Sequence, residues 1–223
     1  MYGKVLSVIE HPRELRRVSS SLPSFAAWTQ EDRAAINDLT ETFAVLQGYG
    51  LAAPQIGALK RVICINPKLL SISDDLESLV MINPTLEVFG EPQRNREACF
   101  SIPEVDGFVE RLDACIVEYV DVHGKKQKLT ATGYAAVCIQ HEVDHLDGIL
   151  YIDRAGQISR SMILKRAKKI CKKKAKLREE AKRAFDEEHA SLDGGITKKT
   201  KTGHSKKRKP KARKRRLKKS KKG

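Results

Sequence analysis

The sequence predicts an α+β protein in which antiparallel β-sheets pack around a central helix that carries the motif HEVDH. Two observations point to this class. Apolar runs of strand length, bounded by Asn, Pro and Gly, gather between residues 61 and 124. Segments with helical spacing lie on both sides of these runs, before residue 49 and after residue 132. A C-terminal helix and a disordered basic tail are expected to follow this core.

The first half of the chain is expected to hold one helix and three strands. The helix begins at Thr29, because Thr29 and Asp32 have the spacing of a capping box. Apolar residues then recur at helical spacing until the helix ends near Gly48. Three apolar runs separated by turn residues predict strands at residues 61–66, 80–90 and 112–124.

The second half is expected to hold two helices. Thr132 can cap the first of them, and Gly148 would end it. This helix is apolar on almost every side, so we expect it to be buried. A second helix runs from about Gln157 to His189, and only its first turns are expected to pack on the body. Its thin apolar stripe consists of Ile158, Met162, Ile163, Ala167, Ile170 and Leu177.

Charge is spread unevenly along the 223 residues, whose net charge is +15. Residues 1–153 carry 14 Lys and Arg against 22 Asp and Glu, a net charge of −8 that does not suggest nucleic-acid binding. Residues 154–197 carry 13 basic and 6 acidic side chains, and residues 198–223 carry 16 basic and no acidic ones. We therefore expect a catalytic domain over 1–153, a basic helix over 154–190 and a disordered tail over 191–223.

Composition also narrows the class of protein. Five cysteines, an odd number without a framework spacing, favour a reducing compartment such as the cytoplasm. The N-terminus resembles neither a signal peptide nor a transit peptide, and no apolar run reaches the roughly 18 residues of a membrane helix. A chain of this length can bury a core without disulfides or a partner subunit, so we expect a monomer.

HEVDH places two imidazoles on one face of a helix. His141 and His145 are four residues apart, so both can bind one tetrahedral metal ion. Glu142 faces a different direction and can take a proton from water at that metal. The alternative is a pair of helical histidines that pack in a core without binding metal. The motif therefore favours a metal-dependent hydrolase with a third ligand elsewhere.

The common positions for a third ligand downstream of HExxH are not available here. Tyr151 occupies the position at which the metzincin pattern has its third His. A Glu about 20 residues downstream is also absent, because residues 154–178 contain no acidic residue. The third ligand must therefore lie upstream.

Three motifs, in order, resemble those of the peptide deformylases. Residues 48–57 read GYGLAAPQIG and match the family's GφGφAAPQφG, where φ is apolar. Residues 97–101 read EACFS and match EGCLS with two substitutions, and residues 140–148 read QHEVDHLDG. The resemblance covers about residues 4–175.

The resemblance implies that Cys99 is the third ligand. One divalent cation would then be held by Cys99, His141 and His145, with Fe(II) the expected native metal and Zn(II), Ni(II) or Co(II) also suited to these ligands. The other four cysteines are expected to be small core residues, although Cys138 could also form a pocket wall.

The resemblance also implies the reaction, which is hydrolysis of an N-formylmethionyl nascent peptide to formate and a free amine. Glu142 would accept a proton from water and return it to the leaving amine. The metal, the Gln55 side chain and the backbone N–H of Phe100 would stabilise the oxyanion. Gly50 would pair with the peptide as an added strand. The methionine pocket would be lined by Tyr49, Glu97, Tyr134, Val137, Cys138 and His141.

Two residues depart from the family pattern, and one more is open to two interpretations. Ala98 replaces a Gly beside the proposed ligand, and Phe100 replaces a Leu. We expect activity to survive these changes, with an altered pocket shape or inhibitor response. Asp144 is expected either to hydrogen-bond to the site's surroundings or to be a solvated carboxylate on the helix.

The basic C-terminal region suggests a ribosomal partner. Several family members use a basic C-terminal helix to dock near the nascent-chain exit, and the tail's charges could bind rRNA through counterion release. No aromatic residues are interleaved in the tail, so sequence-specific readout is not expected. Two other functions remain open: a homologue with altered N-acyl specificity, and a ribosome- or RNA-binding protein on an inactive deformylase scaffold.

Overall fold

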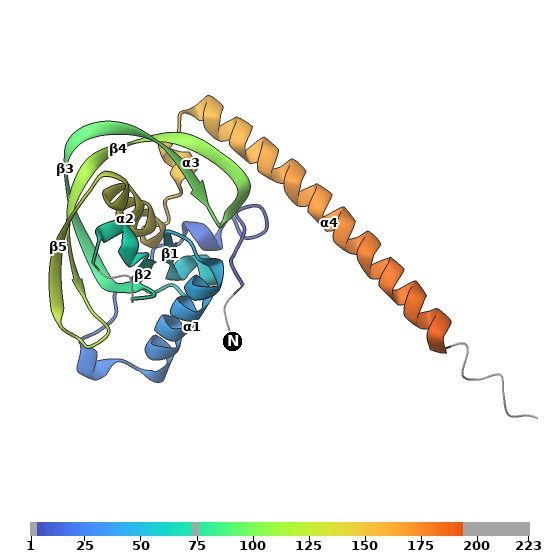
Figure 1. The fold of residues 1–223 in the computed structure, drawn as a ribbon, viewed down its shortest axis with the longest axis horizontal. Helices are drawn as coiled ribbons and strands as arrows, with labels where there is room; N and C mark the ends of the chain where they lie inside the picture. Colours follow the sequence, from blue (N-terminus) through green and yellow to red (C-terminus); the bar gives the residue numbers. More distant parts are fainter. Residues whose placement is uncertain (1–3, 73–75, 194–223) are drawn as a thin grey trace, which may run out of the picture. The chain divides into compact units, whose positions relative to one another are not determined.

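Five antiparallel strands and four α-helices form the described part of the chain. The computed structural model in Figure 1 describes residues 4–72 and 76–193. The strands follow one another in the sheet in chain order. They are β1 (Gly50–Ala52), β2 (Val62–Ile65), β3 (Leu79–Cys99), β4 (Ile102–Val120) and β5 (Lys126–Thr132). The helices are α1 (Gln30–Leu46), α2 (Gly133–Leu146), α3 (Tyr151–Arg154) and α4 (Gln157–Asp193).

The sheet curves around α2, as Figure 1 shows for β3, β4 and β5. Every residue of α2 from Ala135 to Leu146 is buried, which confirms the predicted central helix and the α+β class. Gly148 adopts a φ of +70°, and the helix ends two residues before it. Thr132 holds the N-cap position, but its side chain makes no capping hydrogen bond, so its predicted role was wrong.

Helix α1 begins as the sequence predicts. The Thr29 hydroxyl accepts a hydrogen bond from the Asp32 amide, and the Asp32 carboxylate accepts one from the Thr29 amide, which confirms the capping box. The helix ends at Leu46, followed by Gln47 in the left-handed region. The segment that begins at Gly48 is thereby turned into the first strand, directly beside α2.

The strands differ most from the prediction. Strand β3 contains Asn83 and continues past Gly90, where the predicted strand ended, and both residues have positive φ. Pairing with β4 shifts register close to each of them, so they mark β-bulges within one long strand. The predicted ends of the strands at 80–90 and 112–124 were therefore wrong. Strands β1 and β5 were not predicted.

The first turns of helix α4 pack on the body. Ile163 and Ala167 are buried beside Ile102 and Val105, whereas Ile158 and Met162 of the predicted stripe are exposed. The packed body of the described residues includes α4 as far as Ala175, and the helix continues as a separate unit from Lys176. The division into domains at 153 and 190 stays a prediction, and its tail lies almost wholly outside the described residues.

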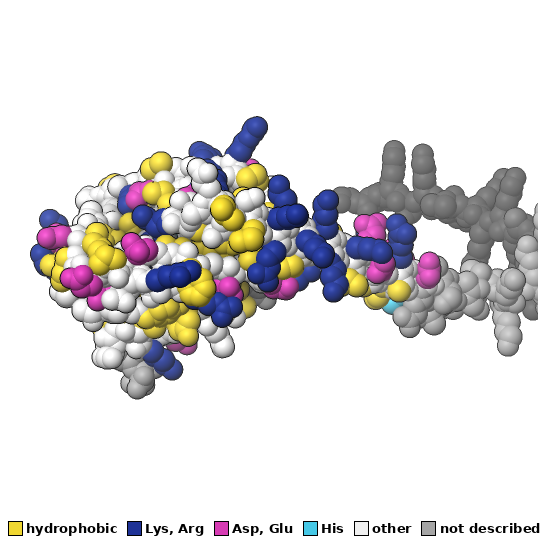
Figure 2. Space-filling view, turned by 90° about the horizontal axis from the view of Figure 1, so that it is seen from above, with side chains coloured by type: hydrophobic (Ala, Val, Ile, Leu, Met, Phe, Trp, Pro, Cys, Tyr) yellow, Lys and Arg dark blue, Asp and Glu magenta, His cyan; other side chains and the backbone are white. Residues whose placement is uncertain are grey.

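Helix α4 is strongly basic over residues 165–172. Lys165, Arg166, Lys168, Lys169 and Lys172 are all exposed, and Figure 2 shows Lys and Arg side chains gathered along the helix. Within residues 4–72 and 76–193, no helix combines the length and the apolar composition that crossing a bilayer requires.

Candidate metal centre and active site

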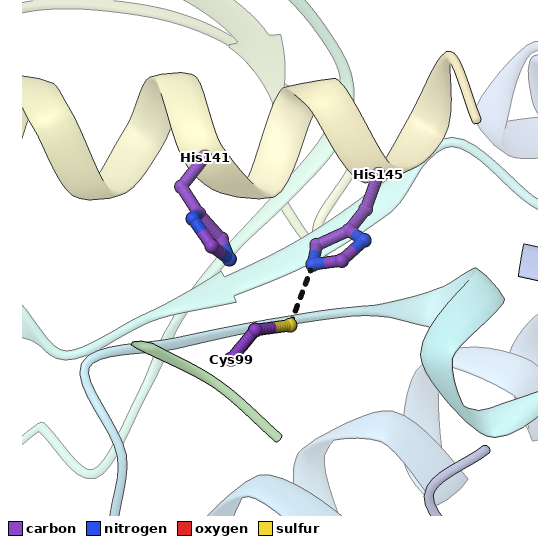
Figure 3. Close-up of side chains that lie close together, drawn as sticks. All are labelled: Cys99, His141 and His145. Atoms are coloured by element: carbon purple, nitrogen blue, oxygen red, sulfur yellow. Dashed lines mark hydrogen bonds between the residues drawn. The ribbon is translucent and has the colours of Figure 1, made fainter. Parts of the chain in front are cut away.

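The three predicted ligands lie together in the interior. Cys99 ends β3, while His141 and His145 project from one face of α2 toward it (Figure 3). Their ligand atoms all lie within 4.8 Å of one another, and all three residues are buried. The Cys99 Sγ is 3.2 Å from the His145 Nε2. The structure thus brings a thiol and two imidazoles to one point.

These atoms suit a tetrahedral metal ion. Metal–sulfur and metal–nitrogen bonds of ordinary length place the ligand atoms about 3.3–3.6 Å apart in such a site, close to the separation observed between Cys99 and His145. Burial and the positive charge of His141 lower the pKa of His145, which favours the neutral, ligating imidazole. Cys plus two His is a donor set for Fe(II), Zn(II), Ni(II) or Co(II).

A network of buried ionic groups lies next to the proposed ligands. His141 Nδ1 lies 2.7 Å from Glu97 Oε2, and Glu97 accepts hydrogen bonds of 2.6 and 3.0 Å from the guanidinium of Arg111. Arg111 also donates to Asp144 at 2.8 Å, and Arg154 holds the same carboxylate at 2.6 and 2.5 Å. Asp144 is thus a paired, buried residue and not a solvated one.

These partners decide the ionisation of Glu97. Burial alone would raise the pKa of Glu97, but hydrogen bonds to His141 and Arg111 outweigh it and lower this pKa to about 2. The same neighbours act in the opposite sense on His141. Its pKa rises well above the usual range despite burial, because the Cys99 and Glu97 side chains bond to the imidazole. Glu97 is therefore a fixed anion beside the first histidine.

Glu142 has a contrasting environment. It is 4% exposed, and its Oε2 has no hydrogen-bond partner within the described residues. Burial raises its pKa to about 7, although the positive charges of His141 and Arg111 act in the opposite direction. A carboxylate with this pKa can both accept and return a proton near neutral pH. A bound divalent cation would favour the ionised form.

The Gln55 side chain lies beside the same ligand atoms. Its Oε1 accepts a hydrogen bond from the Ala52 amide at 2.8 Å, which fixes the direction of the side chain. The amide nitrogen Nε2 then lies 3.4 Å from the Cys99 Sγ and 3.3 Å from the Ser101 hydroxyl. A buried N–H donor is therefore held beside the ligand atoms, where an oxyanion would form.

A cavity of about 800 Å³ opens onto this centre. The Tyr49 and Tyr134 rings meet edge to face at one part of its wall, with centroids 5.3 Å apart. Phe100 is 38% exposed, and its ring lies against Gly48. Of the predicted site residues, the cavity wall includes Tyr49, Gly50, Gln55, Glu97, Cys99, Phe100, Tyr134, Val137, Cys138, His141 and Glu142. His145 completes the ligand set behind this wall.

The sequence comparison decides the family. The polypeptide deformylase family model matches residues 4–161. The chain belongs to the polypeptide deformylase family. The peptide deformylase of Pelagibacter ubique is 37% identical over 168 residues, which are 74% of this chain and 95% of that protein. The Rhizobium meliloti deformylase is 38% identical over 171 residues, 76% of this chain and 94% of the relative.

Solved deformylase structures share the fold. The Legionella pneumophila deformylase superposes with a TM-score of 0.69 at 29% identity, covering 78% of this chain and 98% of that one. The Synechococcus elongatus deformylase, solved in complex with actinonin, has a TM-score of 0.64 at 33% identity. The matched region covers 74% of this chain and 86% of the Synechococcus elongatus chain. The chain is therefore an enzyme of the deformylase family, with a site that suits a divalent metal.

Some residues of the centre were missed by sequence reasoning. Arg111 and Arg154, which pair with Glu97 and Asp144, were not predicted. A signal for Arg111 exists, because it occupies an inward position of β4, where Val109 and Cys115 are buried. No role was predicted for Tyr151, which occupies the position of the third His in the metzincin pattern. Its ring stacks on His141 with centroids 6.1 Å apart, and its hydroxyl donates to the Val105 carbonyl.

Proposed function

We propose that this enzyme hydrolyses the N-formyl group from the N-terminal methionine of nascent polypeptides and releases formate. The observation that carries the proposal is the buried, unpaired oxygen of Glu142 beside the three ligand side chains. An unsatisfied carboxylate oxygen in a protein interior is costly, so it points to a partner that arrives with water, metal or substrate. The cytoplasm, where nascent chains are made, is the proposed compartment.

The metal is proposed to be Fe(II) in the native enzyme, held by Cys99, His141 and His145. Zn(II), Ni(II) and Co(II) suit the same donors and would bind after purification in their presence. When bound, the cation would act as a Lewis acid that lowers the pKa of water and polarises the formyl carbonyl.

The chain's own groups would carry the proton and the charge. Glu142 takes the proton of the attacking water and later delivers it to the leaving α-amine. The Gln55 Nε2 and the Phe100 backbone N–H donate to the oxygen that becomes negative. The Ala52 amide already orients the Gln55 side chain, and the Nε2 would exchange one of its long hydrogen bonds, to Cys99 or Ser101, for one to this oxygen.

The substrate would enter along β1. This strand lies at one end of the sheet order, so one of its edges has no neighbouring strand among the described residues. The peptide would pair with the Gly50 main chain as an added strand. The methionine side chain would enter the part of the cavity lined by Tyr49, Glu97, Tyr134, Val137, Cys138 and His141. Because deformylases of Ehrlichia chaffeensis and Synechococcus elongatus were solved with actinonin, we propose that this cavity also binds it.

The proposal is tested by formate release from a formyl-Met peptide, with an acetyl-Met peptide as the control substrate. Glu142→Ala should abolish formate release while the metal content stays at the wild-type level, since Glu142 is not a ligand. Formate release that survives in this variant, or a wild-type enzyme that prefers the acetyl peptide, would reject the assignment.

We also propose that the basic C-terminal region binds ribosomal RNA. The exposed Lys and Arg side chains of α4 support this, since phosphate contacts of this kind need only a dense, solvated positive surface. Removal of residues 190–223 should weaken ribosome co-sedimentation, and the loss should be larger at low salt than at high salt. Equal binding by both chains would reject the contribution of the tail.

A further inference from the structure

Arg111 is a deeply buried charged group outside the proposed ligands and base. It lies on β4, and its side chain is 2% exposed. Its guanidinium forms ion pairs with Glu97 on β3 and Asp144 on α2. A buried guanidinium is stable only where carboxylates compensate it, and here the two carboxylates come from different elements. Arg111 therefore connects the end of β3 to the last turn of α2.

These two elements carry the whole ligand set. Cys99 follows Glu97 by two residues on β3, and Asp144 lies between His141 and His145 on α2. The distance between the thiol and the imidazoles depends on how β3 and α2 are held together. Arg111 binds both elements within a single planar group, so its geometry limits their relative movement.

Glu97 connects Arg111 to a ligand directly. The carboxylate receives two hydrogen bonds from Arg111, at 2.6 and 3.0 Å, and lies 2.7 Å from the His141 Nδ1. A carboxylate at Nδ1 favours the tautomer with its proton there, which leaves the Nε2 lone pair free for a metal. Glu97 cannot rotate away from His141 without breaking its bonds to Arg111.

We propose that Arg111 is a positioning residue that sets the metal centre. It holds β3 against α2 through Glu97 and Asp144, and it fixes the His141 tautomer through Glu97. Arg111 touches neither metal nor substrate in this role. The proposal concerns metal binding at the proposed site and does not require that the substrate be a formyl peptide.

The first test compares Zn(II) affinities, measured by competition with a chelator, among wild type, Arg111→Met and Arg111→Lys. Loss of a group that orients a ligand typically weakens metal binding about 10–100-fold, which is the loss expected for Arg111→Met. Arg111→Lys should fall between the two, since it keeps the charge and loses the planar fork. The control is Arg61→Met, which breaks an ion pair with Asp147 at the end of α2 and should keep the wild-type affinity.

A second variant separates positioning from charge compensation. The triple variant Arg111→Met, Glu97→Gln, Asp144→Asn removes three buried charges together, so it should regain stability that Arg111→Met loses. Its Zn(II) affinity should stay at least about tenfold below wild type. Full recovery of affinity together with melting temperature would overturn the proposal.

Formate release, measured on the same proteins, distinguishes a failure of this proposal from a failure of the proposed function. A wild type that binds Zn(II) tightly but releases no formate rejects the deformylase activity, while the affinity differences still decide the role of Arg111. Unchanged Zn(II) affinity in Arg111→Met rejects the positioning role even where the wild type is active.

Discussion

Replacing Gly50 by Ala tests whether the rate of formate release depends on the position of the Glu142 carboxylate. A Cβ at residue 50 would lie 2.5 Å from the Glu142 Oε1 and 2.6 Å from its Cγ. Such separations are far below van der Waals contact, so one side must move. Gly50 is held in β1 by pairing with Ile65, and all three residues of this strand, Gly50–Ala52, are buried. The Glu142 side chain must therefore leave its present place.

The magnitude follows from the proposed role of Glu142. A positioned general acid–base contributes about 10²–10⁴-fold to the rate, or about 2.7–5.5 kcal/mol of transition-state stabilisation. Displacement of the carboxylate should remove much of this contribution, so kcat for Gly50→Ala should fall by about 100-fold or more. The ligands Cys99, His141 and His145 are not touched, and metal content should stay at the wild-type level.

The assay is formate release under saturating formyl-Met peptide, with metal content measured on the same samples. Gly156→Ala is the matched control, because no heavy atom lies within 4 Å of a Cβ at that position. It should retain wild-type turnover. A Gly50→Ala enzyme with full metal content and wild-type kcat would refute the reasoning, since it would show that Glu142 can move without loss.

Three further outcomes are expected. A chain ending at Ala175 should keep the wild-type melting temperature, whereas one ending at Gly156 loses the buried Ile163 and should be less stable by about 2–5 kcal/mol in chemical unfolding. Ala98→Gly, at the cavity wall, should change actinonin affinity more than turnover; equal effects would contradict this. For Asp32, the Lys60 hydrogen bond lowers the pKa to about 2 from 3.8, so stability present above about pH 4 is lost toward pH 2. Asp32→Asn should lower the melting temperature at pH 7 and converge on wild type near pH 2.

The sequence was sufficient for features set by local spacing. The capping box of Thr29 and Asp32 and the convergence of His141 and His145 both follow from the helical repeat, and both are found. Cys99 is more than 40 residues from both histidines, and no periodicity connects it to them. Only the resemblance of EACFS to a family motif assigned it.

The remaining features depend on tertiary contacts that a local pattern does not carry. Asn83 and Gly90 have turn chemistry, but a β-bulge uses the same residues while the strand continues. Strand β5 places only two apolar side chains, Leu129 and Ala131, toward the core, so its alternation is too short to predict a strand. Both Ile158 and Ile163 of α4 are apolar, but Ile163 is buried against the body while Ile158 is exposed. The sequence pattern alone does not distinguish the two.

Three buried carboxylates lie near the proposed ligands, namely Glu97, Asp144 and Glu142. Their different partners favour Glu142 as the proposed base. Glu97 and Asp144 are both paired with guanidinium groups, and hydrogen bonds lower the pKa of Glu97 to about 2 despite burial. Glu142 receives no such pairing, and burial raises its pKa to about 7. When environments differ in this way, Glu97 stays ionised and the unpaired Glu142 can exchange a proton at neutral pH. Arg111 pairs with both neighbouring carboxylates, so in the proposed mechanism Glu142 would be the carboxylate that exchanges a proton with water.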